Sequence, residues 1–179
     1  MKSIYALMNQ LSIRTATIAD APILVQIGAQ TFFETFAEQN SKEDMDKYLK
    51  ETFALEKIIS EIENRSFSFL LATDNNQIVG YAKLREDING KYFKETNTFE
   101  IERIYVLKSH LSKGVGATLM QSSIDFAERL GFKIIWLGVW ENNSRAINFY
   151  KRWGFKSFGT HVFILGNDPQ TDILMKKEI

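Results

Sequence analysis

The chain has 179 residues, and its 22 Lys and Arg balance its 22 Asp and Glu, so the formal net charge is zero. This length suits one domain, and we expect a single domain over residues 1–179. A neutral chain has no general attraction to nucleic acid or to anionic membranes. The chain contains no Cys, which excludes disulfides and cysteine nucleophiles.

The N-terminus carries no pattern typical of a secretory leader. Asn9 and Gln10 interrupt its weak apolar run, and no small-residue cleavage site follows. No stretch approaches the roughly 20 apolar residues that cross a bilayer. We therefore expect a cytoplasmic protein with neither membrane nor nucleic acid as its partner.

The N-terminal third of the chain is predicted to be mostly helical. Residues 12–19 are rich in β-branched side chains and indicate a strand, and Asp20 is expected to cap the helix that follows. Asn40 and Ser41 interrupt this helix, and Ser41 has the spacing of a capping residue for a second helix. Residues 55–64 place isoleucines on one face and predict a third helix.

The rest of the chain mixes strand hairpins with strand–helix units. Two strand-like runs flank the turn residues 74–76, and the polar residues 87–97 are expected to form a loop. The elements predicted after that loop are a central strand at 98–107, a helix ending near Gly131, a strand at 133–139, a helix at 144–153, and a closing antiparallel pair at 155–165 and 171–178. This order favours an α+β fold with a mixed sheet.

A glycine-containing loop, Lys113–Ala117, stands at a strand-to-helix junction. Glycines let the backbone approach a ligand, and the free amides at a helix start attract phosphate. The segment is neither a P-loop nor a dinucleotide fingerprint, since Leu119 stands where the latter needs its third glycine. An ordinary turn is the alternative for the loop taken alone.

A second motif, Asn143–Phe155, follows the next strand and ends in Gly-Phe. In this order the two motifs resemble those of the GNAT acetyltransferases, and the resemblance covers about Ile13 to Lys176. It implies a mixed, mostly antiparallel twisted sheet flanked by helices, with strands splayed around an acetyl-CoA cleft. Leu111 departs from the family pattern, which usually has Gln or Arg at this position.

The resemblance also implies a set of residues that bind acetyl-CoA, the expected cosubstrate. Backbone groups of the central strand would face the pantetheine arm, and loop amides would hold the pyrophosphate. The residues are Ile104, Tyr105, Val106, Leu111, Ser112, Lys113, Gly114, Val115, Gly116, Ala117, Asn143, Ala146 and Tyr150. Asn143 is equally suited to a helix N-cap. His110 and His161 lack metal-ligand spacing, so no metal is expected.

Catalysis is expected to need only positioning and proton transfer, without a metal or a covalent enzyme intermediate. Tyr150 matches the family tyrosine that gives a proton to the CoA sulfur, whereas an isolated tyrosine here would simply pack beside Phe149. Glu100 and Glu102 alternate along the central strand and could accept the proton of the amine, with Glu102 slightly preferred. A structural ion pair is the equal alternative for both.

The acceptor is expected to be a small-molecule primary amine. Segments Thr31–Phe36, Glu43–Leu49 and Gly138–Glu141 resemble the PaiA-type branch, which contains spermidine and spermine acetyltransferases. The candidate acceptor-binding residues are Phe32, Phe33, Phe36, Trp140 and Glu141, for which plain core packing or solvent exposure is the alternative. The rival interpretation is an acetyl-CoA-binding regulatory or sensor protein with the same fold and little turnover. The protein itself is expected to be a monomer or a homodimer.

Overall fold

The computed structural model describes residues 11–87, 92–93, 97–165 and 168–179. Residues 1–10, which include Asn9 and Gln10, and most of the expected loop at 87–97 lie outside the described residues. Among the helices of the described ranges, none is both long and apolar enough to span a membrane.

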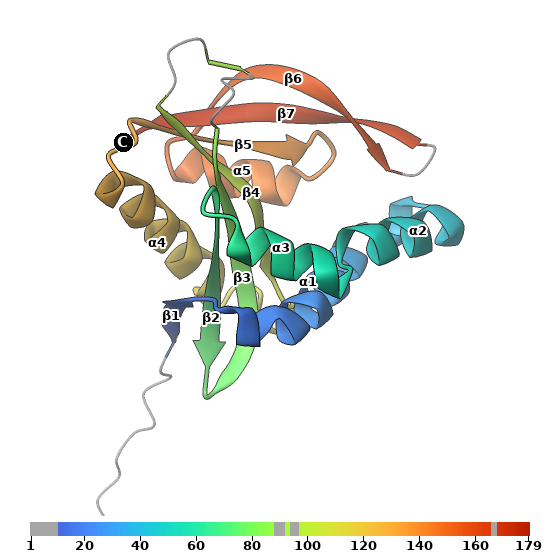
Figure 1. Ribbon diagram of the computed structural model, residues 1–179. Coiled ribbons are helices and arrows are strands. Elements are labelled where there is room, and N and C mark those ends of the chain that lie inside the picture. The colour runs from blue at the N-terminus through green and yellow to red at the C-terminus, as the bar shows by residue number, and fades with distance from the viewer. Residues whose placement is uncertain (1–10, 88–91, 94–96, 166–167) are drawn as a thin grey trace, which may run out of the picture.

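Seven strands form one sheet in the order β1-β2-β3-β4-β5-β7-β6 (Figure 1). The strands are β1 (Ser12–Thr15), β2 (Phe67–Asp74), β3 (Gln77–Glu86), β4 (Thr98–Val106), β5 (Ile134–Trp140), β6 (Lys156–Leu165) and β7 (Asp168–Glu178). Neighbouring strands are antiparallel except β4 and β5, which run parallel. The predicted mixed, mostly antiparallel sheet is confirmed.

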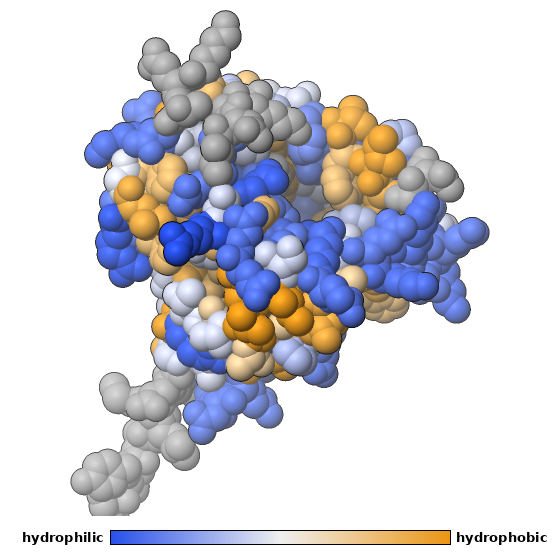
Figure 2. Space-filling model, in the orientation of Figure 1, coloured by the Kyte–Doolittle hydropathy of each residue, from blue (hydrophilic) through white to orange (hydrophobic). Residues whose placement is uncertain are grey.

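The helices cover both faces of this sheet. They are α1 (Ala21–Phe36), α2 (Lys42–Thr52), α3 (Leu55–Glu63), α4 (Val115–Arg129) and α5 (Ser144–Arg152). One apolar cluster packs α1 and α3 against one face, and a second cluster packs α4 and α5 against the other (Figure 1). Helix α2 projects to the side, and Figure 2 shows hydrophilic side chains over its outer surface. We therefore distinguish an α1–α3 face and an α4–α5 face.

Local signals explain most element boundaries. The Ser41 side chain accepts a hydrogen bond from the Asp44 amide, so the predicted cap of α2 is confirmed. Asn75 and Asn76 have φ values of 47° and 64°, the left-handed geometry of a tight hairpin turn between β2 and β3. Gly131 follows α4 with φ 84°, as a helix-ending glycine should.

For residues 12–20 the predicted order of strand and helix holds, and Asp20 occupies the N-cap position of α1, but two details differ. Strand β1 ends at Thr15, because a 3-10 turn over Ile18–Asp20 follows it. The Asp20 carboxylate accepts from the Thr17 amide at 2.8 Å and pairs with Arg14, so it caps this turn and leaves the start of α1 without a side-chain cap. The capping box over residues 17–20 thus replaces the end of the longer strand that was expected here.

Strands β4 and β5 part soon after they meet. They pair at only three described positions, Thr98 with Ile134, Phe99 with Ile135 and Glu100 with Trp136. Strand β4 also has a bulge, because Lys83 pairs with Arg103 and Leu84 with Ile101, which leaves Glu102 as the extra residue. A bulge bends its strand and increases the local twist. The sheet therefore opens beyond Glu100.

Candidate active site

A cavity of about 810 Å³ lies where β4 and β5 diverge. Its walls come from both strands, from the start of α4 and from α5, and from α1, α2, β6 and β7. The opening in the sheet thus connects the α4–α5 face with the α1–α3 face.

The α4 end of the cavity is a backbone cradle. Ser112 and Gly114 have φ values of 65° and 85°, and Gly114 precedes α4 without providing a side-chain cap. The first amides of any α-helix have no intrahelical acceptor, and those of α4 also receive no side-chain cap from Gly114. A Cβ on Gly116 would have Val106 as its nearest neighbour, at 3.8 Å, so the loop keeps open space beside it. Such an arrangement suits phosphate oxygens.

Most of the predicted cofactor residues meet at this cavity. Its lining includes Ile104, Tyr105, Val106, Leu111, Ser112, Gly114, Gly116, Ala117, Asn143, Ala146 and Tyr150. Lys113 is exposed and Val115 is only 2% exposed in the core, so their side chains lie outside the lining. Asn143 lines the cavity and also caps α5, since its side chain accepts from the Ala146 amide at 3.0 Å.

Tyr150 contributes a protonated hydroxyl to the cavity. It lies in α5, is 8% exposed, and packs near Phe149 and Phe155. Burial raises the pKa of Tyr150 well above its ordinary value. Within the described ranges no side chain hydrogen-bonds this hydroxyl. Tyr150 is therefore an available donor over the whole working pH range.

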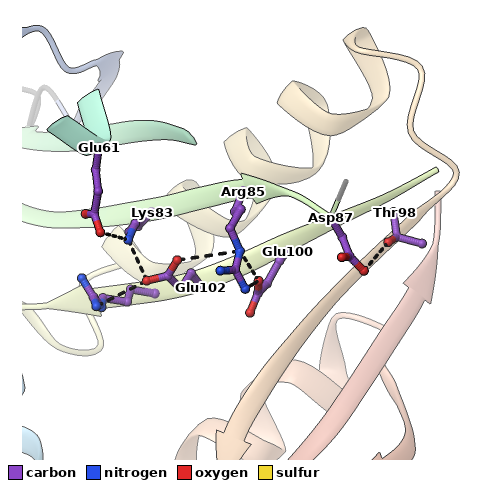
Figure 3. Close-up of polar contacts among 8 residues, drawn as sticks. Glu61, Lys83, Arg85, Asp87, Thr98, Glu100 and Glu102 are labelled. Carbon is purple, nitrogen blue, oxygen red and sulfur yellow. Dashed lines mark hydrogen bonds and ion pairs between the residues drawn. The ribbon is translucent and has the colours of Figure 1, made fainter. Parts of the chain in front are cut away.

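The two glutamates of β4 lie on the α1–α3 face within a chain of ion pairs (Figure 3). Glu100 pairs with Arg85, which is directly opposite it on β3. Glu102 binds the Nζ atom of Lys83 at 2.7 Å, and Lys83 also binds Glu61 of α3 at 2.8 Å. Both glutamates line the cavity, whereas Lys83 lies behind them.

The surroundings of the two glutamates shift their pKa values in opposite directions. Burial raises the pKa of Glu100 more than Arg85 lowers it. Burial also acts to raise the pKa of Glu102, but Lys83 and Arg103 outweigh it, and the net pKa is lowered. A raised pKa makes a carboxylate the better proton acceptor, so these surroundings suit Glu100 to the role of a base more than Glu102, which the sequence slightly favours.

Aromatic side chains, including three of those predicted to bind the acceptor, form one wall of the cavity. Phe32, Phe36 and Trp140 line it, as the sequence suggested. Phe32 stacks on Tyr48 with ring centroids 4.4 Å apart. Phe33 is 52% exposed and Glu141 is also exposed, and both lie outside the lining.

Several lining residues escaped the sequence interpretation. They include Tyr48 of α2, Arg85 of β3, Phe163 of β6 and Asp172 of β7. Asp172 is the one acid in the otherwise apolar and β-branched stretch 171–175, which is a signal that could have singled it out. Glu34, which belongs to the segment Thr31–Phe36 already singled out from the sequence, lines the cavity too. Its carboxylate accepts from the Lys108 amide at 2.8 Å, which ties α1 to the segment before the cradle.

Comparisons with known proteins agree with this geometry. The sequence model of the acetyltransferase (GNAT) family matches residues 29–155. An uncharacterized N-acetyltransferase in the pepI 3′ region of Lactobacillus delbrueckii subsp. lactis is 37% identical over 96% of this chain and 99% of its own length. A spermidine N(1)-acetyltransferase of Thermoplasma acidophilum is 25% identical over 82% of this chain and 88% of its own.

Solved structures show the same fold. The PaiA N-acetyltransferase of Thermoplasma acidophilum, crystallised in complex with coenzyme A, superimposes with a TM-score of 0.79 at 25% identity, covering 95% of this chain and 99% of that one. With the family model matching most of the chain and the cleft formed as that fold requires, the chain belongs to the GNAT family of N-acetyltransferases.

Proposed function

We propose that this protein acetylates a primary amine of a small molecule, with diamines and polyamines as the acceptors, and that one domain carries the whole reaction. The observation that carries the proposal is the opening between β4 and β5, which joins a phosphate-binding cradle to a wall of carboxylates and aromatic rings. Donor and acceptor can thus meet from opposite faces of one sheet, and attack is direct in a ternary complex.

The residues of the cleft fit acetyl-CoA. Free amides at the start of α4 suit the pyrophosphate. Past Glu100, the edge of β4 that faces β5 carries backbone groups with no strand partner, so Ile104–Val106 can hydrogen-bond an extended amide-containing arm. When bound, acetyl-CoA supplies the activated acetyl thioester.

Two residues of the chain manage the protons. The raised pKa of Glu100 suits it to accept the proton that the acceptor ammonium must lose before it can attack. Tyr150 remains protonated and can donate a hydrogen bond, and then its proton, to a leaving sulfur. Glu102, held by Lys83 and Arg103, keeps its charge and shapes the potential of the site.

The preference for diamines and polyamines draws on the acceptor wall. Aromatic faces and carboxylates together attract ammonium groups. A relative that covers most of the chain is named a spermidine acetyltransferase, which supports the same class.

Thiol release from acetyl-CoA tests the proposal. The panel contains spermidine, spermine, simple diamines, monoamines, amino acids and short peptides, with and without enzyme. The proposal requires selective turnover of small amines, led by those with two or more ammonium groups. Binding of acetyl-CoA without release by any amine would favour the sensor interpretation instead.

A further inference from the structure

Asp172 points into the cavity from the side opposite β4. In the sheet register it lies across from Trp140 of β5 and from His161 of β6, and all three residues line the cavity. Its Oδ2 atom lies against Gly138, where an added Cβ would come within 3.2 Å of it. The missing side chain at Gly138 therefore gives the carboxylate room to lean toward the opening.

The Asp172 carboxylate differs from the two glutamates by its lack of a counterion. Glu100 has Arg85 and Glu102 has Lys83, but within the described ranges no side chain donates a hydrogen bond or an ion pair to Asp172. Burial is the sole cause that raises its pKa, to about 6, so Asp172 is still charged at neutral pH. A half-buried charge without a partner is unfavourable in the free protein and is relieved when a cation binds.

The position of Asp172 specifies which part of the acceptor it can reach. Strand β7 is the neighbour of β5 on the side away from β4, and adjacent strands lie about 4.8 Å apart. Asp172 thus lies about one strand beyond the opening, on the same face as Glu100. On β5 the partner of Asp172, Trp140, lies four residues past Trp136, the partner of Glu100, so a nitrogen that reacts in the opening leaves Asp172 facing a group farther along the acceptor.

The neighbours of Asp172 are also suited to a cation. Trp140 and Phe163 line the same part of the cavity, and aromatic faces attract ammonium groups. An acceptor that carries its own carboxylate near the amine, such as an amino acid, would be repelled by the charge of Asp172.

We propose that Asp172 binds the second, non-reacting ammonium group of a diamine or polyamine acceptor and so determines the preference for such acceptors. This inference rests on the proposed function and assigns its specificity to one residue of β7. Asp172 touches the substrate away from the reacting atoms, so its removal should change acceptor preference and leave the chemistry of a simple amine intact.

The test compares 1,4-diaminobutane with pentylamine, which has the same length but a methyl group in place of the second ammonium. Binding of each amine to the enzyme with coenzyme A is measured by titration calorimetry, and turnover by thiol release. Asp172→Asn removes the charge with little change in shape. Glu178→Gln, an exposed position on the same strand and outside the cavity lining, is the matched control.

The wild-type protein should bind the diamine about ten-fold or more tightly than pentylamine, as a charge-assisted contact predicts. Asp172→Asn should abolish most of this difference and change pentylamine binding and turnover less than about two-fold, and Glu178→Gln should change neither. Asp172→Glu keeps the charge on a longer arm and should restore part of the preference.

Three results would overturn the assignment to Asp172: an unchanged diamine preference in Asp172→Asn, an equal loss of both amines, or a wild-type protein that binds neither. Failure of the proposed function has a different signature, because Asp172-dependent diamine binding without thiol release would uphold the binding site and reject the acetyl transfer. If pentylamine is turned over and the diamine preference is the same in Asp172→Asn as in the wild type, the acetyl transfer is upheld and the Asp172 binding site is rejected.

Discussion

The Nζ atom of Lys83, a fully buried side chain, lies 2.7 Å from Oε1 of Glu102. Glu102 is therefore the main counterion of a buried lysine, assisted by Glu61 of α3 at 2.8 Å. This pairing gives Glu102 a structural role that Glu100 does not share, because the partner of Glu100, Arg85, has a side chain that is 40% exposed.

The Glu102→Gln variant should lower the free energy of unfolding by about 1–3 kcal/mol, since Lys83 keeps only Glu61 as a charged partner. Glu100→Gln should cost less than about 1 kcal/mol, because water can solvate Arg85. The pKa of Glu102 is lowered, so its contribution is present above the ordinary glutamate pKa and is lost as the pH falls through the folded value. Urea unfolding at pH 7 and at lower pH measures both effects.

Activity should rank the same two variants in the opposite order. Glu100→Gln should lower kcat/KM for amines more than Glu102→Gln does, once both are compared at temperatures where they are folded. An unchanged kcat/KM in Glu100→Gln would exclude Glu100 as the proton acceptor. Equal losses of stability in Glu100→Gln and Glu102→Gln would contradict the separate structural role of Glu102.

Tyr150→Phe should lower kcat by about 10²–10⁴-fold, the usual contribution of a positioned acid, and leave the affinity for acetyl-CoA unchanged. Because burial raises the pKa of Tyr150, the wild-type rate should not fall on the alkaline side through loss of this proton. Stopped assays from pH 6 to 10, with acetyl-CoA affinity measured separately, give both readouts. Full turnover of the variant at every pH would reduce Tyr150 to a packing residue.

Gly114 and Gly131 provide a matched pair at the two ends of α4. Their φ values are 85° and 84°, and a Cβ at either position would meet nothing within 4 Å. Alanine at each should therefore cost a similar amount of stability, about 1 kcal/mol for left-handed backbone. Only Gly114→Ala should also weaken acetyl-CoA binding, because Gly114 lines the cavity. Equal acetyl-CoA affinities by calorimetry would argue against the cradle.

Diamine binding should weaken as the pH falls through about 6, where the raised pKa of Asp172 lets it take up a proton. His161 of β6 is the titratable side chain that faces Asp172, while Gly138 and Trp140 of β5 carry no charge. The part of the pH dependence that disappears in Asp172→Asn belongs to Asp172. A profile identical in both proteins would contradict this assignment.

The ligand-free Asp172→Asn protein should also be at least as stable as the wild type at pH 8. A carboxylate whose folded pKa is raised destabilises the fold above that pKa, and the penalty disappears as the pH falls below its ordinary value. Melting temperatures of the two proteins at pH 8 and pH 4 measure the change.

Structural features that depend only on residues close together in the sequence could be predicted. The cap at Ser41, the Asn75–Asn76 turn and the glycine after α4 depend on local backbone chemistry, and the two glycine-bearing motifs indicated the family. The ion pair of Lys83 with Glu102 could not be predicted, because it depends on the β3–β4 register and on a bulge.

Asp172 was missed for a similar reason. Its place in the cavity follows from β7 inserting between β5 and β6, an order that periodicity along the chain does not reveal. Phe33 and Phe36 had equal standing in the sequence, and only the packing of α1 turned Phe36 toward the cavity and Phe33 toward solvent.

Product analysis tests the central claim most directly. The enzyme is mixed with acetyl-CoA carrying an isotopically labelled acetyl group and with 1,4-diaminobutane, and thiol and labelled amine are quantified together. We expect monoacetylated diamine and free thiol in equal amounts, both strongly reduced in Tyr150→Phe. Thiol released without acetylated amine, or bound acetyl-CoA that no amine consumes, would contradict the account.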